Sequence, residues 1–330
     1  MPGIEERWCS AMYSGDFSDH VNGSGQPFII GVAGDSGSGK TTFTKIISIV
    51  LGPSRVSTIT LDDYHRYDRM ERAALSITPL HPDANRFDRL ESDVAALKRG
   101  ETIQKPVYNH TDGTFDPDIP FSPKQIIILE GLHPLFTEEL REMIDLSIFV
   151  DPDRDVKYNW KIRRDVGERG HTREAVLAEI RQREPDYEEY VAFQRQYADY
   201  VIKIEESRAA PGRDPPVYSV SLLQADPTAC LLTNVPFTLD LSRILPLADG
   251  PFGIEGGIVE LDGRSRVSLR LDGYLPYGFA RSLEESIETQ TEICALPFFP
   301  GKQVSPTDVI ALLIAWQIIC RQCSLIESPV

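Results

Sequence analysis

The sequence predicts an α/β fold in which helices flank a mainly parallel central sheet, with a smaller α+β region at the C-terminal end. Three observations support this prediction. Apolar runs alternate with amphipathic helical segments from residue 27 onward. The first apolar run ends in a glycine-rich turn that opens a helix. After the Pro/Gly-rich linker at residues 208–216 the pattern changes to short strands.

The elements before the linker follow one another in regular alternation. We expect strands at Phe28–Ala33, Val56–Leu61, Ile126–Leu129, Leu146–Val150 and Val201–Ile204. We expect helices from Lys40, around Asp88–Arg99, around Glu138–Met143, and in one long charged stretch from Arg154 to about Arg183, with Tyr190–Tyr200 leading into the last strand.

The chain divides into three parts by composition. Residues 1–26 are polar and Gly/Ser-rich and are predicted to be a flexible extension, residues 27–208 form the main domain, and residues 209–330 form the α+β region. In the last part, Ile258–Leu261 and Val267–Leu271 are predicted to pair as a hairpin closed by the Asp-Gly turn at 262–263. The final helix has a start signal at Ser305-Pro306-Thr307-Asp308.

Composition excludes several classes of partner. A formal charge of -16 argues against nucleic acid and anionic membrane, which both require a broad basic face. No secretion signal opens the chain, so we expect a cytoplasmic protein. The most apolar run, Val309–Ile319, is about half the roughly 20 residues that span a bilayer and is predicted to be a buried helix. The five cysteines are scattered, which fits a reducing compartment, and any role of Cys320 and Cys323 is left open.

The glycine-rich turn reads G-x-x-x-x-G-K-T, the phosphate-binding P-loop, in the strand-to-helix context that the motif requires. Backbone N–H groups of such a loop and the helix N-terminus hold a polyphosphate, so ATP is the expected ligand. Lys40 is expected to reach the β- and γ-phosphates, and Thr41 to offer a hydroxyl to Mg²⁺. The predicted nucleotide-binding residues are Gly34, Asp35, Ser36, Gly37, Ser38, Gly39, Lys40, Thr41 and Thr42.

A second metal partner is expected at the end of a neighbouring strand. Glu130 follows the apolar run Ile126–Leu129 and is the candidate for holding Mg²⁺ through water. The alternative is a strand-end glutamate that faces solvent.

The second predicted strand ends in a polar cluster, Asp62 to Arg69. Carboxyl ends of parallel strands form the ligand crevice, so this cluster should face the P-loop. Two adjacent carboxylates cannot point the same way, so one of Asp62 and Asp63 should face the site while the other caps or pairs. The alternative is that the whole cluster only caps the next helix.

A basic segment at Arg154–Arg173 carries seven Lys/Arg against three Asp/Glu in a strongly acidic chain. Cations on a mobile lid over ATP would neutralise charge during phosphoryl transfer. The alternative is a solvated helix face with ion pairs such as Lys161–Asp165 and Arg164–Glu168. The side chains that share a face at helical spacing are Lys157, Lys161, Arg164, Asp165 and Arg169.

Successive blocks of the chain resemble the phosphoribulokinase family, in one order from residue 34 to residue 199, and more closely its plant, cyanobacterial and archaeal branch. They are Gly-Asp-Ser-Gly-Ser-Gly-Lys-Thr-Thr (34–42), Leu-Asp-Asp-Tyr-His (61–65), His-Pro-Asp-Ala-Asn-Arg-Phe-Asp (81–88), Lys-Pro-Val-Tyr-Asn-His (105–110), Glu-Gly-Leu-His-Pro (130–134), Trp-Lys-Ile-Arg-Arg-Asp-Val-Gly-Glu-Arg-Gly-His (160–171) and Gln-Tyr-Ala-Asp (196–199).

The resemblance implies a P-loop kinase fold and ATP-dependent phosphorylation of D-ribulose 5-phosphate at its C1 hydroxyl, giving ribulose bisphosphate and ADP. It implies Asp62 as general base and Thr41 and Glu130 as metal partners. It also implies a homodimer in which the C-terminal region contributes to a continued sheet. The catalytic group is implied to include Lys40, Lys161, Arg164 and Asp165, and the sugar-phosphate to be bound by His65, Arg69, Tyr108, His110, Lys161, Arg164 and Arg169.

The chain departs from the photosynthetic enzymes at Ser38, where they carry a cysteine, and it lacks room between Leu51 and Thr60 for the insert that holds the partner thiol. We therefore expect kinase activity to be insensitive to thiol redox state. Two other functions stay open: a uridine kinase-like nucleoside kinase, which needs a base-reading pocket instead of a phosphate pocket, and an inactive ATP-binding regulatory protein, which would be expected to lose its base or lid cations.

Overall fold

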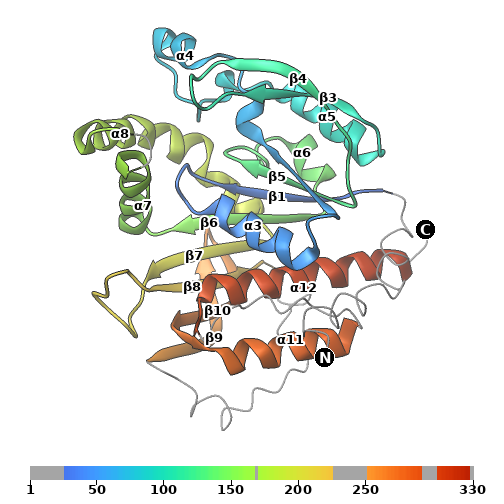
Figure 1. Ribbon diagram of the computed structural model, residues 1–330, viewed down its shortest axis with the longest axis vertical. Coiled ribbons are helices and arrows are strands. Elements are labelled where there is room, and N and C mark those ends of the chain that lie inside the picture. The colour runs from blue at the N-terminus through green and yellow to red at the C-terminus, as the bar shows by residue number, and fades with distance from the viewer. Residues whose placement is uncertain (1–25, 168–169, 226–250, 292–302, 328–330) are drawn as a thin grey trace, which may run out of the picture.

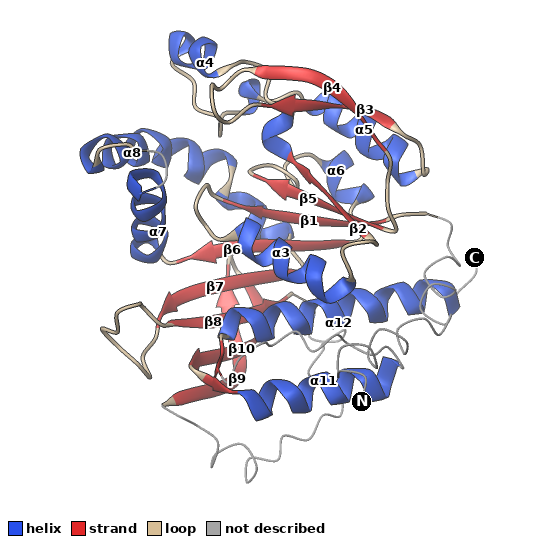
Figure 2. Ribbon diagram, in the orientation of Figure 1, coloured by secondary structure: helices blue, strands red, loops and turns tan. Residues whose placement is uncertain are grey.

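The computed structural model describes residues 26–167, 170–225, 251–291 and 303–327. One eight-stranded sheet runs through the molecule in the order β2-β5-β1-β6-β7-β8-β10-β9, and helices cover both of its faces (Figures 1 and 2). The predicted α/β class is confirmed.

Five neighbouring strands are parallel and form the half of the sheet that carries the P-loop. β1 lies in the middle of this half between β5 and β6, and its residues are buried along its whole length. Parallel strands with helices on both faces are apolar throughout, which is why the sequence shows them as continuous apolar runs. The strands are β1 (Phe28–Gly34), β2 (Val56–Thr60), β5 (Ile126–Gly131), β6 (Leu146–Pro152) and β7 (Tyr200–Glu206).

Three antiparallel strands extend the same sheet: β8 (Tyr218–Gln224), β10 (Arg264–Gly273) and β9 (Phe252–Leu261). The predicted hairpin is confirmed as β9–β10, and both strands are longer than expected. Its turn residues Asp262 and Gly263 have φ values of 51° and 71°, the positive angles that a tight two-residue hairpin turn requires. β9 forms the outer edge of the sheet.

One face of the sheet is covered by α3 (Lys40–Leu51) and α12 (Pro306–Glu327), which lie against each other, with α11 (Tyr277–Thr291) beside α12 (Figure 1). The run Val309–Ile319 is buried in α12, as predicted, apart from Gln317 at its rim. Ser305 Oγ accepts from the Asp308 N–H and Asp308 Oδ2 accepts from the Ser305 N–H, both at 3.2 Å, so the predicted start signal is a capping box. None of the described helices is long and apolar enough to cross a membrane.

The other face is covered by α5 (Phe87–Lys98) and α6 (Glu138–Met143), both at their predicted positions. Short elements complete this side of the chain: the 3₁₀ turns η1 (Leu61–Tyr64), η2 (Pro82–Ala84) and η3 (Ala192–Tyr197), and the helix α4 (Arg69–Leu75). The two-residue strands β11 (Leu275–Pro276) and β12 (Gln303–Val304) pair separately from the main sheet.

Two features differ from the sequence prediction. The stretch from Arg154 divides into α7 (Arg154–Gly167) and α8 (Arg173–Tyr190), because Gly170 has a positive φ of 71° and Thr172 caps a new helix. The two-stranded unit β3 (Ile103–Tyr108) and β4 (Phe115–Phe121) was not predicted. β4 is largely exposed and holds two prolines, so it lacks the apolar alternation that identifies strands.

Candidate active site

The P-loop joins β1 to α3, and helix α7 packs directly on it. Gly37 and Gly39 have positive φ values of 82° and 94°. A Cβ atom at Gly37 would lie 3.3 Å from Lys161 Cβ, and one at Gly39 would lie 3.2 Å from Trp160 Cζ3. Glycine is therefore needed here both for the backbone angle and for the close approach of α7. The nine predicted nucleotide-binding residues run from the last residue of β1, Gly34, through the loop into the first turn of α3.

Lys40 is buried within the cradle, and its Nζ donates to the Asp35 carbonyl oxygen at 2.6 Å. Burial lowers the pKa of Lys40, while the carboxylates of Glu130, Asp35 and Asp62 act in the opposite direction. The ammonium is thus held by a neutral carbonyl, which a phosphate oxygen would replace as a stronger partner.

Glu130, at the end of β5, lies beside the first turn of α3. Thr41 Oγ1 donates to Glu130 Oε1, and Thr44 Oγ1 donates to Glu130 Oε2 at 2.8 Å. Glu130 is buried, so the alternative of a solvent-facing strand-end glutamate is wrong. Thr44 was missed by the sequence analysis, although it lies three residues after Thr41 on the same helix face.

The residues present fit a Mg²⁺ ion. A hydroxyl and a carboxylate side by side are oxygen ligands, and Mg²⁺ commonly takes few protein ligands and completes its shell with water and phosphate. Across the described residues no group of three or more His, Cys, Asp or Glu side chains could hold a metal ion alone. A metal held by Thr41 and Glu130 would therefore depend on the phosphates that the P-loop binds.

Asp62 and Asp63, in η1, point to different partners. Asp63 Oδ1 accepts from the Tyr108 N–H at 2.8 Å, and Asp63 Oδ2 pairs with Lys105. Asp62 has no such tether: its oxygens lie 3.8 Å from the Nε2 atoms of His65 and His110, and its side chain is 32% exposed. Asp62 therefore faces the open crevice, whereas Asp63 anchors β3.

The electrostatic surroundings of Asp62 favour the ionised form. Burial raises the pKa of this carboxyl, but His65, His110, Lys40 and Arg183 together lower it more, so the pKa lies below its ordinary value. Asp62 is consequently a carboxylate at neutral pH, as a group that accepts a proton must be.

Four of the predicted sugar-phosphate residues, His65, Arg69, Tyr108 and His110, form a cluster beside Asp62. Tyr108 lies with its ring centroid 5.3 Å from that of His65 and 5.1 Å from that of His110. Arg69 Nη2 donates to the His110 carbonyl at 2.8 Å. Arg72, which the sequence analysis missed, is buried and donates to the Tyr108 hydroxyl at 2.8 Å. Its position three residues after Arg69 on α4 is the signal that could have identified it.

One face of the basic segment, with Lys157, Lys161 and Arg164, turns toward the P-loop. Lys157 pairs with Asp35 at 3.0 Å, and Lys161 and Arg164 both hold Asp165, at 2.9 and 2.8 Å. The Lys161–Asp165 pair of the alternative interpretation is present, but Lys157, Lys161 and Asp165 are buried, so this face is not solvated. Arg169 and Glu168 lie outside the described residues.

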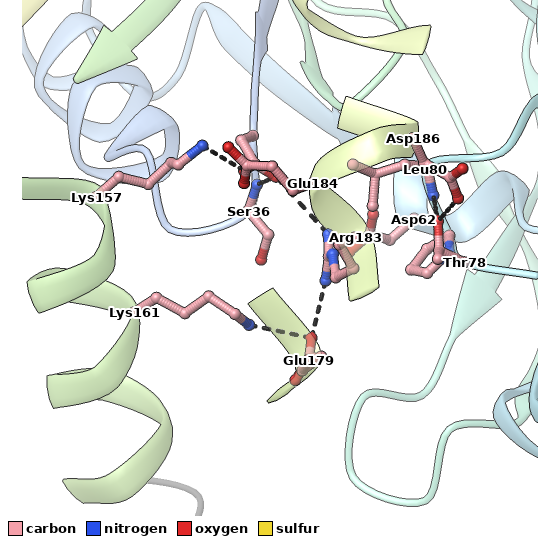
Figure 3. Close-up of polar contacts among 12 residues, drawn as sticks. Ser36, Asp62, Thr78, Leu80, Lys157, Lys161, Glu179, Arg183, Glu184 and Asp186 are labelled. Carbon is pink, nitrogen blue, oxygen red and sulfur yellow. Dashed lines mark hydrogen bonds and ion pairs between the residues drawn. The ribbon is translucent and has the colours of Figure 1, made fainter. Parts of the chain in front are cut away.

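Helix α8 adds two charged residues that the sequence analysis missed (Figure 3). Arg183 Nη1 contacts Glu179 Oε1 at 3.0 Å, and Arg183 Nη2 lies 3.8 Å from Asp35 Oδ1. Glu179 also accepts from Lys161 at 3.1 Å and thereby links α8 to α7. Arg183 lies in the predicted helical stretch, but only the break between α7 and α8 turns it toward the P-loop.

A cavity of about 310 Å³ lies between α7 and the start of β8. Trp160 forms part of its wall and also contacts Gly39, and its indole N–H donates to the Tyr218 hydroxyl at 2.6 Å. Asn159, Arg163 and Arg173 add polar groups.

Together these residues can bind a polyphosphate and a divalent metal beside an ionised carboxylate, with cations surrounding the point between them. Such an arrangement suits the transfer of a phosphoryl group to a hydroxyl. In that reaction the protein contributes mainly by positioning the reactants and neutralising charge, and it forms few covalent bonds itself.

Comparison with known proteins agrees with this geometry. A model of the phosphoribulokinase / uridine kinase family matches residues 29–209. The chain is 43% identical over 198 residues to a phosphoribulokinase of Synechocystis sp., covering 60% of each chain, and 40% identical over 222 residues to a chloroplastic phosphoribulokinase of Mesembryanthemum crystallinum, covering 62% of this chain and 56% of the relative. The match thus spans less than two thirds of these relatives.

Two further similarities extend the comparison. A uridine kinase of Deinococcus deserti is 37% identical over 186 residues, covering 55% of this chain and 90% of the relative. A solved phosphoribulokinase from Rhodobacter spheroides aligns over 90% of this chain and 99% of its own, with a TM-score of 0.53 and 18% identity. At this identity the structural match concerns the fold.

Proposed function

The chain belongs to the phosphoribulokinase / uridine kinase family, and we propose that it transfers the γ-phosphoryl group of ATP to the C1 hydroxyl of D-ribulose 5-phosphate. The observation that carries the proposal is the placement of Asp62: an ionised carboxylate at the open end of β2, between two histidines and next to the P-loop lysine. The curated relatives named phosphoribulokinase, at 35–43% identity, support this acceptor.

Different residues of the chain bind ATP, accept the proton and stabilise the developing charge. Backbone N–H groups of residues 34–42 and the Lys40 ammonium bind the phosphates of ATP. Asp62 accepts the proton of the C1 hydroxyl as that oxygen attacks. Lys161 and Arg164 leave their ion pairs with Asp165 and Glu179 and instead stabilise the negative charge that develops on the phosphoryl group during transfer. Mg²⁺, held by Thr41 and Glu130, would neutralise charge on the β- and γ-phosphates.

The remaining sugar-phosphate contacts are proposed by the same reasoning. His65 and His110 flank the base and are placed to orient the sugar, while Arg69 and Arg169 are the cations proposed for its 5-phosphate. Tyr108 packs between the histidines and completes this wall. The cavity beside Trp160 is proposed to receive the adenine base of ATP, since Trp160 lies against Gly39 of the P-loop and gives the cavity an aromatic wall.

Two broader properties are also proposed. We infer a cytoplasmic homodimer with a small-molecule substrate and with neither nucleic acid nor membrane as partner. The acidic net charge supports the absence of polyanionic partners. The outer edge of β9, with which no strand of the described residues pairs, supports association between two copies.

The test is a comparison of acceptors with the purified protein. ATP consumption is measured with ribulose 5-phosphate, uridine and fructose 6-phosphate side by side. We expect ribulose 5-phosphate to be turned over far faster than uridine, and its KM to rise with salt because ions screen the exposed cations. Equal turnover of uridine would make the protein a nucleoside kinase, and no turnover of any acceptor would favour the ATP-binding regulatory protein.

A further inference from the structure

His133 is a buried side chain next to the candidate base that the mechanism above does not use. It follows β5, three residues after Glu130, and is only 2% exposed. Neither of its ring nitrogens has a hydrogen-bond partner among the described residues. A buried polar group without a partner costs free energy. An unpaired buried imidazole beside an active site is therefore a candidate to bind a ligand that supplies the missing hydrogen bond.

The ring is fixed in position by aromatic neighbours. Its centroid lies 5.7 Å from that of Phe87 and 5.2 Å from that of Phe136, both in edge-to-face geometry, and the two phenyl rings stack on each other at 4.8 Å. These contacts hold the imidazole plane without using its nitrogens. The ring of His133 is therefore held in one orientation, and its two nitrogens are available for hydrogen bonds.

His133 and Asp62 line the same small recess. The recess has a volume of about 10 Å³, room for one oxygen atom with its hydrogens, and Asp62 lies at its exposed side. Four other polar side chains line it. His65 and Asn85 are bonded to each other at 3.1 Å, the Tyr64 hydroxyl donates to Asp93 at 2.9 Å, and Arg86 donates to the Arg66 carbonyl at 3.4 Å. The Asn85 amide nitrogen also donates to the carbonyls of Pro79 and His81. Both ring nitrogens of His133, by contrast, lack a hydrogen-bond partner among the described residues and can bind an incoming group.

We propose that His133 binds the C3 hydroxyl of the acceptor sugar inside this recess and so helps to select the acceptor. The proposal rests on the proposed function, because it takes ribulose 5-phosphate as the acceptor. When the C1 hydroxyl lies within hydrogen-bond distance of Asp62, the C2 and C3 oxygens of the sugar lie at the opening of the recess. Only one of them fits, given its size.

The chemistry of a neutral imidazole points to a hydroxyl. Burial lowers the pKa of His133 to about 3, so the ring carries one N–H and one lone pair at neutral pH. A hydroxyl can donate to the lone pair or accept from the N–H, whereas a carbonyl oxygen can only accept. The C2 oxygen of ribulose 5-phosphate is a carbonyl, so the C3 oxygen is the nearest group that can donate.

The experiment combines a variant with substrate analogues. His133→Phe and the wild-type protein are assayed with ribulose 5-phosphate and with its 3-deoxy and 4-deoxy analogues. We expect the variant to lose about 10- to 100-fold in kcat/KM for ribulose 5-phosphate, with the KM for ATP within about twofold. The wild-type protein should disfavour the 3-deoxy analogue by a similar factor, and the variant should not, while both should treat the 4-deoxy analogue alike.

Matched controls separate binding from folding. Ser219→Ala removes another buried polar group that has no partner among the described residues, on β8 away from the recess, and should leave kcat/KM unchanged. His133→Phe should keep or raise the melting temperature, because an apolar ring replaces an unpaired polar one between Phe87 and Phe136. If it does not fold, His133→Asn, which retains a hydrogen-bonding group, should show a smaller loss of the same selectivity.

The outcomes are distinct. If the wild-type protein fails to phosphorylate ribulose 5-phosphate, the proposed function is overturned and this inference with it. If it turns over ribulose 5-phosphate but both proteins discriminate against the 3-deoxy analogue equally, only the inference is overturned. Unchanged kinetics with a raised melting temperature would overturn the inference alone, since His133 would then affect only stability.

Discussion

At the scale of single residues, the pair Asp62 and Asp63 shows how neighbours of one chemical type take different roles. The sequence predicts that one faces the site and the other pairs, since consecutive side chains at a strand end point apart. The environment determines which is which: Lys105 and the Tyr108 N–H take Asp63, and the two histidines leave Asp62 open to a ligand. Asp62 therefore retains a free lone pair for a substrate proton.

Asp62→Asn should lower kcat by a factor on the order of 10² to 10⁴ while ATP binding is retained, because an amide cannot take the proton. Steady-state kinetics and ATP titration measure the two effects. Asp63→Asn is the matched control: it weakens the pair with Lys105 and should lower the melting temperature with a milder effect on kcat. A larger kcat loss in Asp63→Asn than in Asp62→Asn would reverse the assignment.

At the scale of elements, α7 and α8 act as a charged cover over the P-loop. Lys157 and Arg183 approach Asp35 from the two helices, and Glu179 joins them through Lys161 (Figure 3). Burial raises the pKa of Asp35, but Arg183 and Lys157 lower it more, so the pair remains ionic. The cations of both helices are thus held by carboxylates. When ATP binds, its negatively charged phosphates would replace these carboxylates as partners, as expected of a lid that closes on ATP.

The ion pairs of α7 predict a stability that depends on pH. Burial raises the pKa of Asp165, but hydrogen bonds from Arg164 and Lys161 lower it to about 2, below the ordinary value of 3.8. The stabilisation is therefore complete above the ordinary value and is lost as the pH falls toward 2. Between pH 5 and pH 2 the melting temperature of the wild type should fall more steeply than that of Asp165→Asn.

The same variant should be less stable than the wild type at pH 7, because Lys161 and Arg164 lose their shared partner. Asp155→Asn, an exposed position on the same helix, is the control and should follow the wild-type curve. Parallel curves for the wild type and Asp165→Asn would show that this pair contributes nothing to acid sensitivity.

At the scale of the whole molecule, the eight-stranded sheet connects the P-loop half to the C-terminal region. β8 pairs with β7, so residues on both sides of the predicted boundary at 208 share one sheet, and their division into two domains stays a prediction. The sheet ends at β9, a ten-residue strand without proline or lysine, where Ile258 is 73% exposed. Such an edge is a template for another strand.

If two copies associate through this edge, Ile258→Lys should shift the protein from dimer to monomer, because a charged side chain on an edge strand opposes pairing. Sedimentation velocity at micromolar concentration measures the state. Ile119→Lys, on the separate unit β3–β4, removes another exposed apolar side chain and should stay dimeric. A monomeric wild type, or a dimeric Ile258→Lys variant, would contradict the proposed dimer.

Much of the fold could be predicted from local patterns. Buried parallel strands appear as apolar runs, the P-loop is specified by residue type and spacing, and the Asp262-Gly263 turn and the Ser305–Asp308 cap depend on neighbours in the chain. Each of these features depends on residues that lie close together in the chain, so it can be predicted from the sequence. The unit β3–β4 escaped because its prolines and exposed residues remove the alternation that marks a strand.

The sequence by itself thus determined the phosphate cradle, the order of the elements and the pair of carboxylates from which the base is proposed. The tertiary structure decided which carboxylate is free, which cations meet Asp35, and that His133 is buried with unpaired nitrogens beside Asp62. Burial and hydrogen-bond partners arise from residues far apart in the chain, such as Lys105 for Asp63 and Arg183 for Asp35. Their energetic effect depends on distance and desolvation, which exist only once the chain has folded.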